Sequence, residues 1–255
     1  MSTYQDYINS LKENSMTFWW PKVKDLDIPM PETVMIDCSQ YHDQFWSMLD
    51  GKAAIPLAEQ IEKVVIEQFG YPCFIRGDQC AGKHQYMETC FIDDTSDTKN
   101  HYYQEHRIKY FRFHVYNLVE AALNGPGVLP DAFFVREFLE LEYKFTAFHN
   151  LPIAKERRYF VKDGEVVCNH PYWPVESIRF DSYCVVPPDN WQGLLEELNT
   201  LSEEDKKILY QYSKKIAQIL EGYWSVDFAK GVNGTWYFID TAKGDVSFHW
   251  PQCQL

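Results

Sequence analysis

The sequence has little positive charge for its length. It carries 24 lysine and arginine residues against 37 aspartate and glutamate residues, for a formal net charge of -13. Nucleic-acid backbones and anionic membranes attract basic surfaces, so neither is an expected partner. No apolar run approaches membrane-spanning length, and residues 1–20 lack the basic and apolar regions of a signal peptide. These absences predict a soluble cytoplasmic protein.

The cysteine pattern does not predict a disulfide framework and gives no support for a structural zinc site. Their number is odd, and no two form a C-x-x-C pair. The seven are Cys38, Cys73, Cys80, Cys90, Cys168, Cys184 and Cys253. Cys80 is either a reactive thiol or, as we favour, a small residue filling a strand end. The histidines show no ligand spacing with a carboxylate, and no role is assigned to them.

Several catalytic signatures are also missing. The Gly-x-x-x-x-Gly-Lys-Ser/Thr pattern of a P-loop does not occur. Neither a Gly-x-Ser-x-Gly nucleophile elbow nor a papain-like cysteine signature occurs.

What the sequence does contain predicts an α+β fold. Hydrophobic residues make up 45% and aromatic residues 16%, enough for a substantial core. We expect residues 1–130 to form an N-terminal α/β part and residues 131–255 to form a C-terminal part rich in antiparallel strands. Helices are expected over 55–69, 107–123, 194–200 and 206–220, and hairpins over 158–167 and 225–239. Asn233-Gly234 in the last hairpin predicts a type I′ turn.

The first charged segment follows an apolar strand at residues 72–75. Arg76 and Lys83 are seven positions apart, and the residues between them include Gly77, Asp78 and Gly82. Glycines let backbone N–H groups approach phosphate oxygens, and an arginine fork with a lysine suits a polyphosphate. The alternative is a solvated turn with two ordinary surface cations, which this pair alone would favour.

The second segment is Arg136-Glu137, which closes an apolar strand. The peptide groups that follow it, through Phe138 and Leu139, can pair with the edge of an adenine ring. An edge strand with alternating charges explains the same pattern equally well.

Two further pairs of charged residues lie in the C-terminal part. Glu156 and Arg158 alternate along a strand and so point to one face, where they bind a ligand or form an ion pair. Asp227 and Asp240 occupy matching positions on two strands of a hairpin. Apposed carboxylates repel unless a cation lies between them, which favours a metal site. The alternative is that Lys230 and Lys243 compensate their charge.

In combination these segments resemble the ATP-grasp superfamily, in particular its clade named for one arginine and two lysines. That clade is related to the eukaryotic assembly chaperone of translation initiation factor two. In this pattern a strand ends in an arginine followed by a lysine, here Arg76 and Lys83. A hinge strand ends in Arg-Glu, here Arg136 and Glu137.

The rest of the resemblance lies in the C-terminal part. A Glu-x-Arg-x-Phe-Val strand before an Asp-Gly turn occupies residues 156–164. An aspartate follows at Asp227, and a final strand ends in an acid at Asp240. The family usually has an asparagine two residues beyond that acid as a second magnesium ligand, and this sequence has Ala242 instead.

The resemblance implies two subdomains with mostly antiparallel sheets that clamp ATP with Mg²⁺. The usual reaction activates a carboxylate as an acyl-phosphate, which an amine then attacks. The implied phosphate contacts are Arg76, Lys83 and Arg158, and the implied metal ligands are Asp227 and Asp240. Arg136, Glu137, Phe138 and Leu139 surround the adenine, and Glu156 orients a phosphate ligand or the amine.

Two other functions stay open at this point. One is a non-catalytic ATP-binding assembly chaperone or adaptor with a protein partner, which Ala242 favours. The other is a structural domain with a decayed site. The acid and the amine are not identified by the sequence.

Overall fold

The computed structural model describes residues 4–51, 56–94, 107–180, 186–251 and 253. Cys184 and most of the expected polar loop at 93–100 lie outside these residues. The chain divides into two compact units, of which one is Glu32–Phe138 and the other combines Met1–Pro31 with Leu139–Leu255. We call these the middle unit and the outer unit. Of the described helices, none has the length and apolar character needed to cross a membrane.

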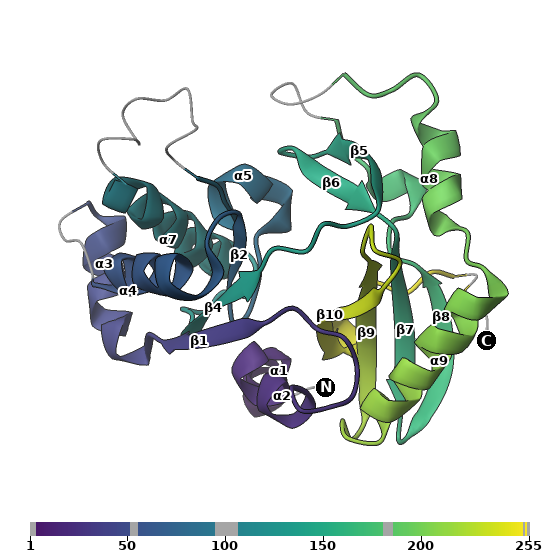
Figure 1. The fold of residues 1–255 in the computed structure, drawn as a ribbon. Helices are drawn as coiled ribbons and strands as arrows, with labels where there is room; N and C mark the ends of the chain where they lie inside the picture. Colours follow the sequence, from purple (N-terminus) through teal and green to yellow (C-terminus); the bar gives the residue numbers. More distant parts are fainter. Residues whose placement is uncertain (1–3, 52–55, 95–106, 181–185, 252, 254–255) are drawn as a thin grey trace. The chain divides into compact units, whose positions relative to one another are not determined.

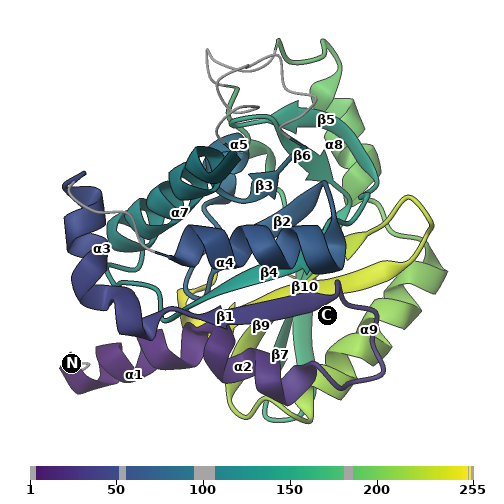
Figure 2. The same ribbon diagram turned by 60° about the vertical axis from the view of Figure 1, so that its left-hand side comes forward.

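The middle unit is a four-stranded sheet in the order β1-β4-β2-β3 with antiparallel neighbours. Helices α4 and α7 pack against each other and against the sheet (Figure 2). The strands are β1 (Thr33–Asp37), β2 (Cys73–Gly77), β3 (Phe91–Ile92) and β4 (Ala132–Glu137). The helices are η1 (Ser39–Tyr41), α3 (His42–Leu49), α4 (Leu57–Val64), η2 (Val65–Phe69), η3 (Lys83–Gln85), α5 (Tyr86–Thr89) and α7 (Arg107–Asn124).

Strand alternation gives the middle sheet two distinct faces. Ile75 pairs with Val135, and both are fully buried in the core that includes Ile61 of α4 and Leu118 of α7. Side chains alternate along a strand, so the residues directly before and after Ile75 and Val135 point to the opposite face. That opposite face carries Arg76 on β2 and Arg136 on β4.

The outer unit is built on a second antiparallel sheet, in the order β10-β9-β7-β8. A two-stranded sheet, β5-β6, belongs to the same unit. The strands are β5 (Tyr143–Ala147), β6 (Leu151–Ala154), β7 (Glu156–Lys162), β8 (Glu165–Pro171), β9 (Tyr223–Lys230) and β10 (Trp236–Lys243). The helices are α1 (Tyr4–Asn14), α2 (Met16–Val23), η4 (Val175–Ser177), α8 (Trp191–Asn199), α9 (Glu203–Ala217) and η5 (Gly244–Val246).

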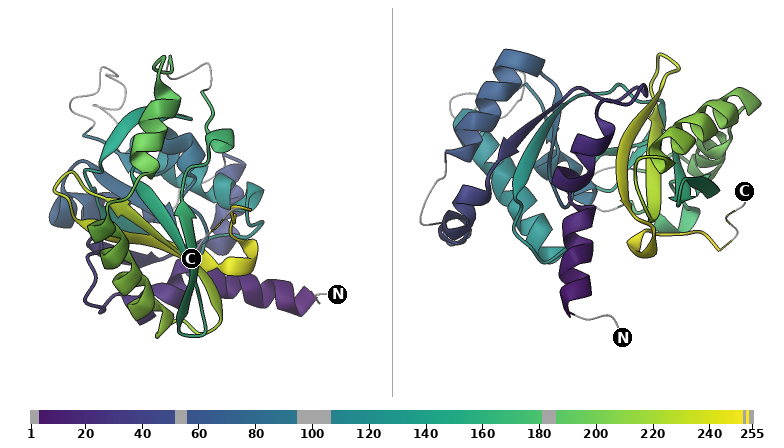
Figure 3. Two further views of the ribbon diagram at one scale, coloured as in Figure 1. Left: turned by 90° about the vertical axis from the view of Figure 1, so that its right-hand side faces the viewer. Right: turned by 90° about the horizontal axis from the view of Figure 1, so that it is seen from below.

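Helices cover the face of the outer sheet that carries its large aromatic residues. Helix α9 runs along β7 and β8 (Figure 1), and α1 lies beside β10 (Figure 3). The ring of Phe228 contacts Tyr212 of α9, and Phe238 contacts Trp19 of α2. Residues 1–31 therefore complete the core of the outer unit.

Asp205 anchors α9 to the strands beneath it. It forms the predicted capping box with Ser202, and its Oδ1 also accepts hydrogen bonds from Lys230 Nζ at 2.8 Å and Trp236 Nε1 at 2.6 Å. Burial alone would raise the pKa of Asp205, but these donors and Ser202 lower it to about 2. The carboxylate is thus held ionised inside the unit.

The structure confirms the α+β fold with antiparallel sheets and corrects one turn. A type I′ turn requires positive φ at both central residues, but of Asn233 and Gly234 only Gly234 has one, at 82°. Strand β9 ends at Lys230 and β10 begins at Trp236, so a loop of five residues connects them. Within this loop, Gly234 N donates to Gly231 O. The wider loop allows Asn233 Oδ1 to accept from Thr235 N at 3.0 Å.

The two units of the structure are divided at other positions than the boundary between residues 130 and 131 that we expected from the sequence. Strand β4 follows that boundary in sequence, yet it is paired on both edges inside the middle unit. Residues 1–31 likewise belong with the C-terminal part. The two units are joined by two connections, after Pro31 and after Phe138.

Candidate functional site

Two predicted arginines share one face of the middle sheet. Phe74 lies opposite Arg136 and Arg76 lies opposite Phe134, so the two arginines are diagonal neighbours on β2 and β4. Both side chains are buried, at 5% and 4% exposure. Arg76 Nε donates to Gly77 O, and Arg136 Nε donates to Thr33 Oγ1. Two guanidinium groups on one face provide several N–H donors, so this face is suited to an anion.

Lys83 follows the loop that leaves β2, and local contacts fix this loop. Asp78 is fully buried, and its Oδ1 accepts from Asp131 N at 3.2 Å. Gly82 has φ of 63°, and a Cβ there would lie 2.9 Å from Thr89. Thr89 Oγ1 in turn donates to Gly82 O at 2.9 Å. A glycine at position 82 is therefore required to bring the half-buried Lys83 to its place after β2.

The positive charge of Lys83 affects the pKa of the next residue, His84. Burial, and then the positive charge of Lys83, lower the pKa of His84 below its ordinary value. The lowered pKa favours the neutral form of His84 beside the Lys83 cation.

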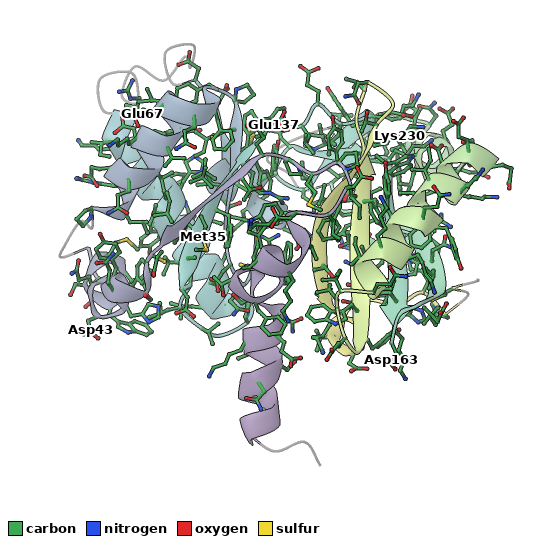
Figure 4. The ribbon with its side chains drawn as sticks, turned by 60° about the horizontal axis from the view of Figure 1, so that its bottom comes forward. Met35, Asp43, Glu67, Glu137, Asp163 and Lys230 are labelled. Atoms are coloured by element: carbon green, nitrogen blue, oxygen red, sulfur yellow. The ribbon has the colours of Figure 1, made fainter. Side chains whose placement is uncertain are left out.

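Glu137 and Phe138 end the middle unit, and Leu139 begins the second part of the outer unit. Glu137 N donates to Glu32 O at 2.9 Å, and Glu32 N donates to Glu137 Oε2 at 3.2 Å. Glu137 at the end of β4 is labelled in Figure 4. The two connections between the units thus leave the middle unit side by side. Phe138 contacts the ring of Phe91 edge-on, at 5.4 Å between centroids.

Four predicted residues lie on one face of the outer sheet. Arg158 on β7 is directly opposite Asp227 on β9, which is directly opposite Asp240 on β10. Directly opposite residues point to the same face, and Glu156 lies two residues before Arg158 on that face. One guanidinium and three carboxylates therefore converge here.

A β-bulge brings Asp240 to this face. Trp236 pairs with Lys230, and an unbroken register would place Ile239 opposite Asp227. The register shifts between Phe238 and Asp240, so Ile239 is the extra residue and Asp240 faces Asp227. The prediction that the two aspartates lie close is confirmed, but it depends on a β-bulge that the sequence analysis did not predict.

Arg158 and Asp227 form a two-point ion pair. Arg158 Nε and Nη2 each donate to a different oxygen of Asp227, both at 2.7 Å. The side chains are 14% and 5% exposed. Burial alone would lower the pKa of Arg158, but the charge and hydrogen bonds of Asp227 raise it above its ordinary value. The guanidinium is therefore permanently charged.

This pair changes how the charge on Asp227 is balanced. Lys230 contacts Asp205, and Lys243 contacts Glu13, so each of these lysines has another carboxylate partner. Arg158 supplies the compensation instead. A carboxylate has about four lone-pair positions, so two arginine donors leave room for a metal ion on Asp227.

Two aromatic residues that the sequence analysis did not select flank this face. The guanidinium of Arg158 lies 4.8 Å from the centre of the Tyr172 ring. Trp173 Nε1 donates to Glu156 Oε1 at 3.0 Å. Glu156 is buried, and this donor orients its carboxylate. The Tyr-Trp dipeptide directly after β8 was the available signal, but only the fold shows which acid and base it contacts.

Ala242 also lies on this face, two residues beyond Asp240. It pairs with Ser225, whose Oγ lies 3.3 Å from Ala242 O and 2.7 Å from Ser247 Oγ. The methyl group supplies no ligand atom at the position where the resembling family has an asparagine. The predicted departure from the family pattern is therefore located beside the two aspartates.

The predicted residues are thus divided between the two units. Arg76, Arg136 and Lys83 belong to the middle unit with Glu137 and Phe138. Glu156, Arg158, Asp227 and Asp240 belong to the outer unit with Leu139.

Comparisons with known proteins give a fold and no closer relationship. No protein-family model matches the sequence, and no curated protein matches it significantly. C-terminally truncated Cdc123 from Schizosaccharomyces pombe matches with a TM-score of 0.52 and 14% identity, over 92% of this chain and 85% of that chain. A second Cdc123 structure from this yeast matches with a TM-score of 0.52 and 13% identity, over 92% and 85% of the two chains.

ATP-grasp ligases are also among the structural neighbours. A RimK domain ATP-grasp protein from Sphaerobacter thermophilus matches with a TM-score of 0.44 and 14% identity, over 95% of this chain and 61% of that chain. The chain spans about half the length of another neighbour, the ATP-grasp ligase PsnB, at 53%. At these identities the matches concern the fold alone, and that fold is α+β with ATP-grasp structural neighbours.

Proposed function

We propose that this chain binds ATP together with Mg²⁺. One observation carries the proposal: Arg158, Asp227 and Asp240 form a continuous line across three strands, with Glu156 on the same face. Two apposed carboxylates repel, and a divalent cation between them converts that repulsion into binding. The finer assignment, to the clade named for one arginine and two lysines, is part of this proposal.

The donor sets fit the two halves of a metal–nucleotide complex. Carboxylate oxygens of Asp227 and Asp240 are the ligands that Mg²⁺ prefers, and the nucleotide's own oxygens would complete its coordination. Arg76, Lys83 and Arg158 would contact the phosphates, since guanidinium and ammonium groups donate to phosphate oxygens. The backbone of residues 137–139, with Arg136 behind it, would contact the adenine.

We further propose that the chain is an ATP-dependent carboxylate–amine ligase that acts through an acyl-phosphate. Such a reaction needs no side-chain nucleophile, because it depends on holding the reactants in line and neutralising phosphate charge. Arg158 would stabilise the transferred phosphate, and Glu156, oriented by Trp173, would position the phosphate ligand or the amine. The acidic composition supports a cytoplasmic location and partners other than nucleic acid or a membrane.

The second candidate is a non-catalytic ATP-binding assembly chaperone or adaptor with a protein partner. Ala242 favours it, because one expected ligand for a second magnesium ion is missing. Such a protein would bind ATP without turning it over.

A thermal shift scan with ATP, GTP and Mg²⁺ tests nucleotide binding. A ligand at about a hundred times its Kd stabilises the fold by roughly 2.7 kcal/mol, which raises Tm by roughly 5–10 °C in a chain of this size. No shift with any nucleotide at millimolar concentration would refute the binding proposal. Release of ADP and phosphate on addition of acids and amines then separates the ligase from the adaptor.

A further inference from the structure

A cluster of soft metal ligands joins β8 to the segment after η5, and it includes none of the charged residues assigned above. It consists of Cys168, His249 and Cys253. The two cysteine Sγ atoms and one imidazole nitrogen of His249 all lie within 4.8 Å of one another. Cys168 Sγ lies 2.9 Å from His249 Nε2. We call these three residues the Cys-His-Cys cluster.

The surroundings of the cluster fix its geometry. Cys168 is buried and pairs with Phe160 of β7. The ring of His249 packs edge-on against Phe160, with 4.3 Å between centroids. The next residue, Trp250, stacks on His170, with 5.5 Å between centroids. The imidazole is thereby oriented with its Nε2 toward the Cys168 sulfur.

The ligand types select a class of metal ion. Thiolate sulfur prefers Zn²⁺ or Cu⁺ to Mg²⁺ or Ca²⁺, and imidazole suits the same ions. In a tetrahedral zinc site with Zn–S of about 2.3 Å and Zn–N of about 2.0 Å, ligand atoms lie roughly 3.5–3.8 Å apart. The cluster reaches this spacing through side-chain movements of about 1 Å or less.

The geometry points to a zinc site formed by Cys168, His249 and Cys253, with the fourth position open to water or an external ligand. The site differs from the proposed magnesium site in ligand chemistry, because it contains sulfur and nitrogen and no carboxylate. None of its three ligands is a residue that we propose to contact the nucleotide.

Zinc at this position would hold residues 247–253 against the sheet. Phe248 O accepts from Arg158 Nη1 at 3.4 Å, and Ser247 Oγ contacts Ser225 Oγ at 2.7 Å. The segment therefore contacts the same face as Arg158 and Asp227. A metal ion that ties Cys253 to β8 would fix this segment where it already contacts Arg158.

Cobalt titration of the full chain tests the site. Protein is treated with a chelator and a phosphine reductant, and Co²⁺ is added without oxygen while absorption is recorded. Thiolate ligation of Co²⁺ gives an intense near-ultraviolet charge-transfer band, and a tetrahedral site gives visible bands. We expect both to saturate at one Co²⁺ per chain and to disappear when Zn²⁺ is added.

Variants tie the signal to the cluster. Cys168→Ser and Cys253→Ser should each weaken the charge-transfer band, and the double variant should abolish it. Cys80→Ser is the matched control, since Cys80 is half-buried like Cys253 and lies in the middle unit. Zn²⁺ should also raise Tm in the wild type and in Cys80→Ser but not in Cys253→Ser, whose fold is checked by circular dichroism.

Three results would overturn the proposal. The first is a folded, reduced wild type with no charge-transfer band. The second is a band that survives in the Cys168→Ser/Cys253→Ser double variant. The third is a loss of two reactive thiols on air oxidation together with no cobalt band after reduction, which would make the two cysteines a disulfide pair instead.

Discussion

Replacing Asp227 with asparagine should destabilise the outer unit strongly. The substitution keeps the size of the side chain but removes the anion that accepts from Arg158 at 2.7 Å through both of its oxygens. The side chains of the pair are only 14% and 5% exposed, so Arg158 would stay buried with its charge less well compensated. Removing one partner of a buried pair costs about 3–5 kcal/mol. Asp240 and Glu156 share the face, so we expect about 3 kcal/mol, the low end.

Urea unfolding followed by tryptophan fluorescence measures this loss. Of the eight tryptophans only Trp46 lies in residues 32–138, so the signal reports mainly on the outer unit. A loss of about 3 kcal/mol lowers the urea midpoint by roughly 1–2 M. The matched control is Asp245→Asn, an exposed aspartate of the same unit, which should leave the midpoint unchanged.

A double-mutant cycle with Arg158→Met then isolates the pair. Asp227→Asn should cost much less in the Arg158→Met background, because the buried cation is already gone. An Asp227→Asn midpoint equal to that of the wild type, or strictly additive costs in the cycle, would refute the reasoning.

Three further predictions concern other parts of the chain. Lys83→Ala should weaken ATP binding, measured by calorimetry, without changing the Tm of the nucleotide-free protein. Lys63→Ala is the control, because Lys63 is an exposed lysine of the same unit. If Lys83→Ala is unfolded, Lys83 has a structural role instead. Gly82→Ala should cost about 1–2 kcal/mol in urea unfolding, since φ is 63° and the new Cβ would lie 2.9 Å from Thr89; an unchanged midpoint would contradict this. The pKa of Asp205 is lowered to about 2, so roughly 2 kcal/mol of stability should be present above pH 4 and be lost as the pH falls toward 2. Asp205→Asn should flatten this pH dependence of stability. An equally steep loss in the variant would mean that another group causes it.

The sequence predicted those features that depend on local pattern. The capping box of Ser202 and Asp205, the helices and the hairpins follow from residues close together in the chain. The nearness of Asp227 and Asp240 follows from hairpin geometry, although the bulge at Ile239 is what turns Asp240 to the correct face. A bulge depends on the packing of both strands, so the local sequence does not reveal it.

The features that the sequence missed depend on distant pairings. The partner of Asp227 is Arg158, and recognising it requires knowing that β7 lies beside β9. Cys168 and His249 are likewise 81 residues apart in the sequence. The affiliation of residues 1–31 with the outer unit rests on contacts such as Trp19 with Phe238. No periodicity or spacing carries such information.

Calorimetric titration of Mg²⁺ with and without ATP tests the central claim most directly. Because Ala242 supplies no ligand, Mg²⁺ should bind only together with the triphosphate, which contributes its own oxygens. Asp240→Asn should remove that binding while leaving the free energy of unfolding of the nucleotide-free protein within about 1 kcal/mol of the wild type, since it relieves a like-charge pair. Tight Mg²⁺ binding in the absence of nucleotide, unaffected by Asp240→Asn, would contradict the account.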